Sequence, residues 1–459
     1  MSMINNALSG TMAAQAALNL TSQNVANVMT PGYTRQGILL TSASSSRTGA
    51  LAAGDGVNTP SLFRFSDDYK SQQMWNAASN QGQYSVVQPY QTQLEQVMGD
   101  DGSTLNTGLD AFFSALNAAS VEPSSSPLRQ QVISAADALA QRFNSLNQVL
   151  SAQRASVQQQ RGTLVDQVNS LSTEIAKLND RISGASATGT STSSLVDERD
   201  NKIDSLAALV GVSVVNQPDG SRSVSLRNGE PLVAGSLAAR MSVQTSASGV
   251  QSLAVKFASQ TFNVANTHAG GQLGGLGDFE TRVLTPLTQS ISDMASQISS
   301  QVNAQLAAGF TQAGTAGSAL FVYNASSVSG MLQITPGVQP KDLGFSSSAT
   351  LPGDSGNLLK VIALKNQAIS VTSLGTVLMG DAYTQLVSRL GTESQQNQAS
   401  LTVANTVRTY ARSNWQSTSG VNKDEEAINL VQYQQMYQAN MKVISVANQL
   451  FDSTLALLP

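Results

Sequence analysis

The chain has 459 residues, enough for two or three domains with a sizeable core. Charged residues make up 12% of it and the net charge is −4, which gives no support for a nucleic-acid partner. There is no cysteine and one histidine, which excludes a disulfide framework and most metal sites built from thiolates or imidazoles. The sequence has neither a long apolar run for a membrane span nor a start like a cleaved signal peptide. We therefore expect no membrane insertion.

The first segment, residues 3–29, is predicted to be one helix. Apolar and small polar residues recur at alternating steps of three and four, as on one face of a helix. Pro31 should end it, because the residue before a proline is pushed out of the helical region. Gly32 can take the positive φ of a tight turn, and Tyr33 can then fold back on the last helical turn. The first charged residue of the chain is Arg35, which follows this turn.

The next segments alternate between linkers and long helices. Residues 41–62 are rich in Ser, Gly and Ala and are predicted to be an extended connection. A helix is expected over about 67–98. A very long helix should open at Ser126, a candidate N-cap, with Pro127 in the first helical position, and its heptad-like apolar stripe indicates a coiled coil or helical bundle. Residues 183–194 are predicted to be a linker.

The middle of the chain changes to a two-residue period. Residues 211–280 alternate apolar and polar positions and contain Pro-Asp-Gly and Asn-Gly turn signals, so they predict a small β domain. Helical spacing returns at 284–302, and 310–356 is rich in Gly, Ser and Thr with two strand-like pieces. Two further helices are expected over about 357–379 and 381–417.

The last segment is predicted to be a well-capped helix. Asn422 and Glu425 have the spacing of a capping box, and Asp424 and Glu426 add acidic charge to the first turn. Apolar residues then recur every seven positions from Leu430. Gln434 and Asn448 fall beside this repeat, and they either belong to a polar face or fix the helix register through buried hydrogen bonds.

Both ends of the chain are thus long, nearly uncharged, amphipathic helices, and we expect them to pack as an antiparallel pair. A single pair leaves much apolar surface open, which neighbouring subunits could cover. The ends should then be poorly ordered alone and become ordered on assembly. The residues expected at this assembly interface are Leu8, Leu18, Asn24, Val25, Asn27, Pro31, Gly32, Tyr33, Leu430, Gln434, Tyr437, Met441, Ile444, Asn448, Phe451, Leu455 and Leu458.

Residues for catalysis are scarce. The run Asp197-Glu198-Arg199-Asp200 could supply paired carboxylates for acid–base work, but a solvated helix start is the better interpretation. His268 lies between polar and glycine residues and is expected to be an ordinary loop histidine. The segment "GGQLGGLG" matches no phosphate-binding motif. We therefore predict neither an enzyme nor a metal or cofactor site.

Two terminal stretches carry a family resemblance. "ALSGTMAAQAALNLTSQNVANVMTPGYTRQ" resembles the N-terminal signature of the flagellar rod, hook and hook-associated axial proteins. "SGVNKDEEAINLVQYQQMYQANMKVISVANQLFDSTLALL" resembles their C-terminal signature. The Gln-Arg-Phe and Leu-Asn repeats over 141–182, followed by "LVDERD", resemble the hook-associated protein 1 family, whose members join hook to filament.

The resemblance implies a fold that is mainly α with a β insertion. It implies a terminal-helix domain lining a tube (1–36 and 422–459), a helical second domain (37–205, 281–318 and 355–421) and a β-rich outer domain (206–280, with 319–354 as a candidate addition).

The resemblance also implies a place and partners. It implies export through the flagellar type III apparatus and an extracellular position at the hook–filament junction. The implied partners are the hook protein, a second hook-associated junction protein, identical neighbouring subunits and an export chaperone on the C-terminal helix. The alternative is a secreted translocator or adhesin with coiled-coil arms.

Overall fold

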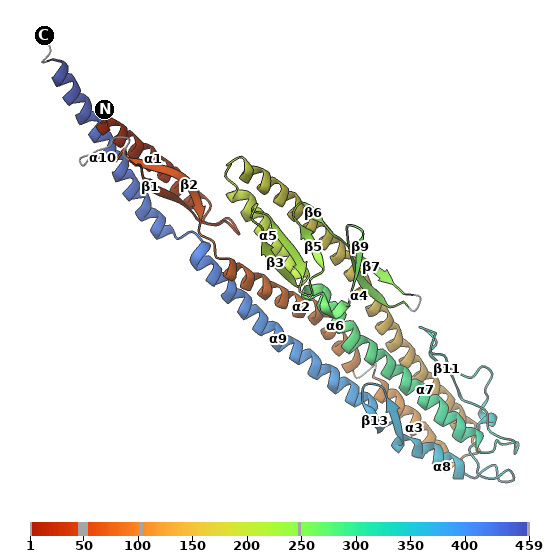
Figure 1. Ribbon diagram of the computed structural model, residues 1–459. Coiled ribbons are helices and arrows are strands. Elements are labelled where there is room, and N and C mark those ends of the chain that lie inside the picture. The colour runs from red at the N-terminus through yellow and green to blue at the C-terminus, as the bar shows by residue number, and fades with distance from the viewer. Residues whose placement is uncertain (1, 45–53, 101–103, 247–248, 457–459) are drawn as a thin grey trace.

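The computed structural model describes residues 2–44, 54–100, 104–246 and 249–456. They form an elongated molecule in which long helices run along the main axis and small sheets lie on one side (Figure 1). The N- and C-terminal helices lie together at one end of this rod. Within the described residues, no helix is both long and apolar enough for a membrane span.

Helices make up most of the structure. Along the chain they are α1 (Ser2–Ala26), α2 (Asp68–Gly99), α3 (Leu105–Val121), α4 (Ser126–Ala187), α5 (Ser193–Leu209), α6 (Gly271–Phe279), α7 (Thr285–Ala307), α8 (Gly356–Ala363), α9 (Ala382–Ser419) and α10 (Lys423–Leu455). Three short 3-10 helices are η1 (Asn266–His268), η3 (Pro340–Asp342) and η4 (Leu364–Asn366), and η2 (Glu280–Leu284) is a π-helical segment between α6 and α7.

The strands form five antiparallel sheets among the described residues. Two sheets make up the β insertion, one of four strands and one of three, and the other three sheets are hairpins. The strands are β1 (Gln36–Ser42), β2 (Val57–Arg64), β3 (Val212–Asn216), β4 (Arg222–Leu226), β5 (Pro231–Ala234), β6 (Leu237–Ala238), β7 (Arg240–Thr245), β8 (Gln251–Phe257), β9 (Gln260–Val264), β10 (Phe321–Tyr323), β11 (Leu332–Ile334), β12 (Ala368–Val371) and β13 (Gly375–Leu378).

The long helix α4 is the spine against which the other layers pack. Its apolar stripe is buried over its whole length, from Val132 through Phe143 and Leu164 to Ile182. Helices α3 and α5 and strands from both larger sheets contact it. The β insertion therefore lies along the spine and shares one continuous apolar core with the helices.

The structures predicted for two segments were wrong. Residues 41–62 are not a plain connection, because β1 and β2 form a hairpin that packs against α1. Asn6 Nδ2 donates to the carbonyl of Gly54, and the Val57 amide donates to Ser9 Oγ. The overall Ser/Gly/Ala-rich composition of the segment hid the short apolar runs of the two strands.

Residues 357–379 are not one helix. They form α8, η4 and the hairpin β12–β13. The carboxylate of Asp293 accepts hydrogen bonds from the Thr372 amide, at 2.9 Å, and from its hydroxyl, at 2.6 Å. Gln297, one turn further along α7, bonds the backbone of Ser370. These contacts with a distant helix favour the strand conformation of a β-branched segment.

Helices α2 and α4 begin close to their predicted starts, and a further helix, α3, lies between them. Asp67 caps α2 through hydrogen bonds to the Tyr69 and Lys70 amides. Helix α4 begins at Ser126, so its N-cap is Ser125 rather than Ser126 as predicted. Helix α3 was not predicted, and its apolar face, including Phe112 and Phe113, is buried.

The crossing of α2 and α6 depends on a glycine. A Cβ added at Gly275 would lie 2.2 Å from the backbone oxygen of Gln83, closer than real contacts allow. We expect Gly275→Ala to lower the free energy of unfolding by about 1–3 kcal/mol, because a rigid backbone must move. Gly162→Ala, in α4, is the matched control, since its added Cβ meets no atom within 4 Å and it should stabilise by about 0.5–1 kcal/mol. Equal thermal or denaturant midpoints for the two variants would contradict the close packing.

Candidate assembly interface

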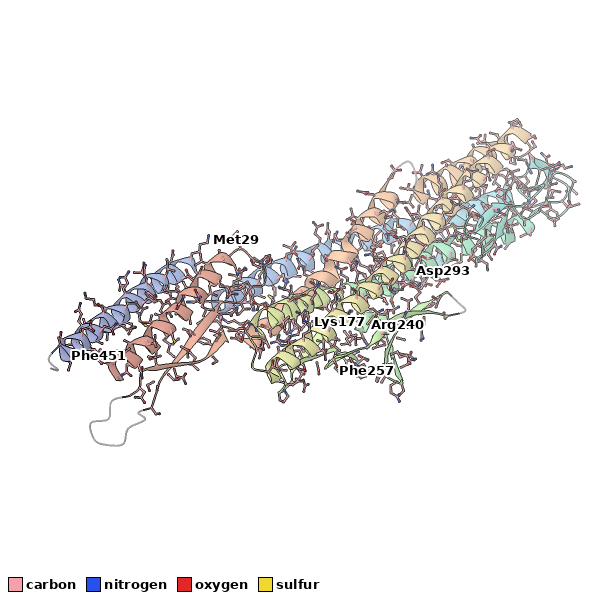
Figure 2. The ribbon with its side chains drawn as sticks, turned by 90° about the horizontal axis from the view of Figure 1, so that it is seen from above. Met29, Lys177, Arg240, Phe257, Asp293 and Phe451 are labelled. Carbon is pink, nitrogen blue, oxygen red and sulfur yellow. The ribbon has the colours of Figure 1, made fainter. Side chains whose placement is uncertain are left out.

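Helices α1 and α10 pack side by side as an antiparallel pair within one chain. α10 is the longer helix, and its C-terminal end continues beyond the start of α1 (Figure 1). Met29 and Phe451 lie near opposite ends of this terminal pair (Figure 2). We use "terminal pair" for α1 and α10 together. The expected antiparallel arrangement is therefore present in a single subunit.

Only one face of α10 is covered by α1. Along this face, Glu426 and Ala447 are buried, while Tyr433, Asn440 and Ile444 are partly exposed. Their spacings of seven, four and three residues place them on one side of the helix.

The other faces of α10, and its end beyond the start of α1, carry exposed apolar side chains. The exposed fractions reach 67% at Ile428, 57% at Leu450 and 63% at Phe451. The exposed large apolar residues of α10 are Ile428, Leu430, Val431, Met441, Val443, Val446, Leu450, Phe451 and Leu455. Those of α1 are Met3, Leu8, Met12 and Val25. A helix that is apolar around most of its circumference is typical of an element that is buried on several sides.

The terminal pair is fastened at its base by Asn24, which is 2% exposed. Its side-chain Nδ2 donates to the Gln36 carbonyl, at 2.9 Å, and to Glu426 Oε2, at 3.2 Å. Its Oδ1 accepts from the Tyr33 hydroxyl, at 2.8 Å, and from the Gln36 amide, at 3.1 Å. Two donors and two acceptor sites of one amide are thus satisfied, which joins α1, the following turn and α10.

Arg35 continues this network. Its Nε lies 2.7 Å from Oε1 of Glu426, which is 1% exposed, and its Nη1 lies 2.5 Å from Oε2 of Glu425. Its guanidinium also stacks on Phe65, 4.8 Å from the ring centre. The Arg35 amide donates to the carbonyl of Ser419, at the end of α9. The first charged residue of the chain therefore ties the N-terminal segment to both helices of the C-terminal segment.

Asp197 of α5 fixes the same segment from the other side. Its carboxylate accepts from the Thr34 amide, at 3.1 Å, and forms an ion pair with Arg64 of β2. Burial raises the pKa of Asp197, and the charge of Arg64 opposes the rise. Burial also raises the pKa of Tyr33 to about 12, with further contributions from the charges of Asp197 and Glu426. The Tyr33 hydroxyl is therefore protonated near neutral pH and can donate to Asn24.

The predicted turn after α1 has the expected geometry. α1 ends at Ala26, Gly32 has a φ of 75°, and Tyr33 folds back onto Asn24. Asn27 donates to the Gln23 carbonyl, and its Oδ1 accepts from the Thr30 hydroxyl. Pro31 is exposed, and its carbonyl accepts from Asn201 of α5.

The other predicted interface residues fall into three groups. The partly buried group consists of Leu18, Tyr437 and Ile444. The exposed group consists of Leu8, Val25, Leu430, Gln434, Met441, Asn448, Phe451 and Leu455. The idea that Gln434 and Asn448 form buried hydrogen bonds does not hold within the chain, where the buried amide that links the helices is Asn24. Leu458 lies outside the described residues.

Some residues of this site escaped the sequence analysis. Asp197 was assigned to a solvated helix start, but it is 7% exposed and lies inside α5. Glu426 was assigned only a role at the helix start, although it is the buried partner of Arg35 and Asn24. No local pattern distinguishes Glu426 from Asp424 and Glu425, because its partners Asn24 and Arg35 are far away in the sequence.

The comparison with protein families decides the identity. Residues 91–321, half of the chain, match the family described as "Flagellar hook-associated protein FlgK helical domain". The chain belongs to this FlgK family. Residues 4–34 match "Flagella basal body rod protein", and 412–457 match "Flagellar basal body rod FlgEFG protein C-terminal". The two terminal matches cover most of α1 with the turn after it, and the end of α9 with all of α10.

Individual relatives agree with this membership. The chain is 27% identical to "Flagellar hook-associated protein 1" of Escherichia coli (strain K12), over 98% of this chain and 99% of that protein. It is 28% identical to the protein of the same name from Salmonella typhimurium, over 99% of each chain. It is 25% identical to the protein of the same name from Bacillus subtilis (strain 168), over 96% of this chain and 95% of that protein.

A solved structure supports the fold. The hook junction protein FlgK from Burkholderia pseudomallei aligns with a TM-score of 0.66 at 18% identity, covering 76% of this chain and 100% of that chain. The predicted fold class, mainly α with a β insertion, is confirmed. As a FlgK family member, the chain is a structural, hook-associated protein of the bacterial flagellum, not an enzyme.

The Asn24 network yields a prediction for local stability. In Asn24→Ala, the Tyr33 hydroxyl, the Gln36 backbone and one oxygen of Glu426 lose a partner. Each buried polar group left unsatisfied costs about 1–3 kcal/mol, so the base of the terminal pair should open more often. We expect faster amide hydrogen exchange in α1 and α10 but unchanged exchange in α4. Asn19→Ala, at an exposed position of the same helix, is the control and should leave the exchange unchanged.

Proposed function

We propose that this protein joins hook to filament as a structural adaptor, and that its terminal pair becomes fully ordered and covered when subunits assemble. The main support is the apolar surface of α10, of which α1 covers only one face. Each large apolar side chain buried between subunits would contribute about 1.5–3 kcal/mol. Several such side chains on each copy would favour association even at a substantial entropic cost.

The proposal assigns a place to each part of the rod. The inside of the tube would be lined by residues 1–36 and 422–459. The surrounding helical domain would consist of 37–205, 281–318 and 355–421. The β-rich part, 206–280, would face outward. The packing of β1 and β2 on α1 favours counting that hairpin with the terminal pair. The network of Asn24, Arg35 and Asp197 would then set the angle between inner and outer parts.

The same surface suggests the partners. The hook protein would contact the terminal pair from below and the second junction protein from above, with identical subunits beside it. During export through the type III apparatus, the exposed apolar face of α10 would need a cover, which we assign to an export chaperone. The absence of cysteine suits export in an unfolded form, because no disulfide has to form afterwards. The protein would thus be extracellular, at the hook–filament junction.

The double variant Phe451→Asp plus Leu455→Asp tests the role of the terminal pair. Both side chains are more than half exposed, so the variant should fold as a soluble monomer. It should fail to assemble, because two unpaired carboxylates would be buried between subunits. Circular dichroism and size-exclusion chromatography would check the fold, and occupancy of the hook end would report assembly.

A matched control places the same charges elsewhere. Val121 and Leu237 are 87% and 63% exposed and lie outside the terminal pair. Val121→Asp plus Leu237→Asp should assemble like the unmodified chain. Normal assembly by the Phe451 and Leu455 variant would refute the proposed role of α10.

Binding to isolated hooks tests the adaptor function itself. Labelled protein added to hooks stripped of junction proteins should appear at one hook end when imaged by electron microscopy. Its location there would agree with the partners proposed above. A folded protein that binds no hook, even with the second junction and cap proteins supplied, would instead favour a secreted translocator or adhesin.

A further inference from the structure

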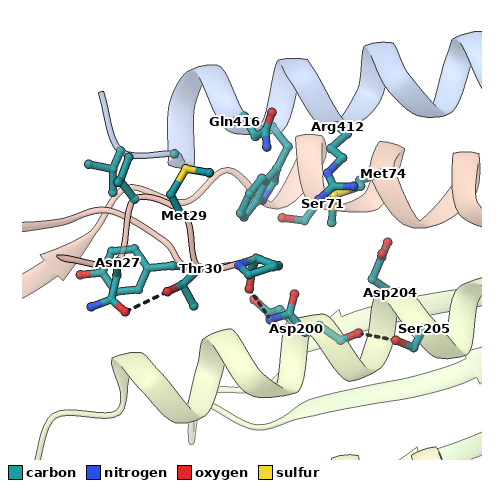
Figure 3. A pocket seen from close by; sticks show the side chains of 18 of the residues that line it. Asn27, Met29, Thr30, Ser71, Met74, Asp200, Asp204, Ser205, Arg412 and Gln416 are labelled. Atoms are coloured by element: carbon teal, nitrogen blue, oxygen red, sulfur yellow. Dashed lines mark hydrogen bonds between the residues drawn. The ribbon is translucent and has the colours of Figure 1, made fainter. Parts of the chain in front are cut away.

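A pocket of about 600 Å³ lies at the base of the terminal pair. It is enclosed by the turn after α1, by α2 and α5, and by the last turns of α9. Figure 3 shows Arg412 and Gln416 from α9 and Asp200 and Asp204 from α5 around it. Its volume falls within the range of about 300–1,000 Å³ that is typical of binding pockets. Both tryptophans of the chain, Trp75 and Trp415, line it.

The pocket contains groups that lack partners in the described part of the chain. Trp75 is 2% exposed, yet its indole Nε1 has no hydrogen-bond acceptor there. Arg412 is exposed and forms no ion pair with any described residue. The nearby carboxylates are already engaged, since Asp204 pairs with Arg408 and Asp200 pairs with Arg222. The pocket therefore offers a mixed lining, in which Met29, Met74 and Trp415 are apolar, and one available positive charge at Arg412.

The far end of α10 has the complementary chemistry. The face that packs on α1 continues past the start of α1, where Phe451 and Leu455 are 63% and 51% exposed. At 100° per residue, Asp452 falls beside them within an arc of about 100°. Its carboxylate forms no ion pair or side-chain hydrogen bond in the portion of the chain described by the structure. Two large apolar side chains and one unpaired negative charge thus project together.

We propose that this pocket receives the C-terminal end of α10 from a second copy of the chain. Phe451 and Leu455 pack against Met29 and Trp415, which line the pocket and are accessible, and Asp452 pairs with Arg412. This inference rests on the proposed function, because it assumes that copies associate through their terminal helices. It adds the receiving site and its selectivity for an apolar helix end with a carboxylate.

The contact has a geometric consequence. The pocket includes Val421, just before α10, and the docking residues begin at Phe451, near its end. At 1.5 Å per residue, the two sites are roughly 45 Å apart along the helix. The contact is head-to-tail, so it relates copies by a shift along the axis. Such heterologous contacts generate rings or helical assemblies, which agrees with a tubular structure.

Tryptophan fluorescence provides a direct test, because both tryptophans line the pocket. The receptor is the full chain with Phe451→Asp and Leu455→Asp, whose own C-terminal end does not compete. The probe is a synthetic peptide of residues 440–459, with a scrambled peptide as control. We expect a saturable change in emission with the probe only. An unchanged emission would overturn the proposal.

Charge reversal tests the pairing. Adding Arg412→Asp to the receptor should weaken binding of the peptide by about tenfold or more. Asp452→Arg in the peptide should weaken binding to a similar extent. Combining the two reversals should restore most of the affinity. Affinity that is indifferent to Arg412, or not restored by the combination, would overturn the assigned pocket. The proposed function would survive that result if the Phe451 and Leu455 variant still fails to assemble, so the two ideas can fail separately.

Discussion

The structure depends on one buried polar junction, in which Asn24, Glu426 and Arg35 are held together at the base of the terminal pair. These groups link segments that are about 400 residues apart in the chain. A buried carboxylate is costly unless it is paired and hydrogen-bonded, and Glu426 has both kinds of partner. Apolar contacts alone would let two amphipathic helices slide past each other. The directional bonds of Asn24 allow one register.

Charge is scarce near the chain ends. α1 contains no charged residue, and after Glu426 α10 contains only Lys442 and Asp452. A surface that is to be buried between subunits avoids charges, because each one would need a partner in the assembled state. The few charges present near the base are paired within the chain. The rest of α10 is left apolar on faces that the chain does not cover.

The other parts of the molecule hold this end in position. The spine helix α4 carries the β insertion and, through α5, presents Asp197 to the turn after α1. Asp197 holds the Thr34 amide and Arg64, so the hairpin, the turn and the helical rod meet at one carboxylate. Stability of the rod and orientation of the terminal pair are therefore coupled through a small number of hydrogen bonds. The pocket with both tryptophans lies beside this coupling point.

The sequence by itself determined much of this protein, because periodicity and local motifs act over short distances. The terminal helices, the Pro-Gly-Tyr turn, the β insertion and the family could all be predicted from it. The prediction that the chain is not an enzyme agrees with its family membership. Gly32 and Asn422 could be assigned because a positive φ and a helix cap are local requirements.

The tertiary structure decided what depends on distant partners. Asp197 and Glu426 look like ordinary helix-start acids until Thr34 and Arg35 are placed against them. The hairpin β12–β13 replaced a predicted helix because α7 supplies hydrogen bonds to it. Which face of α10 stays open likewise depends on where α1 begins and ends. Periodicity shows that a helix has an apolar face, but only packing shows whether that face is already covered.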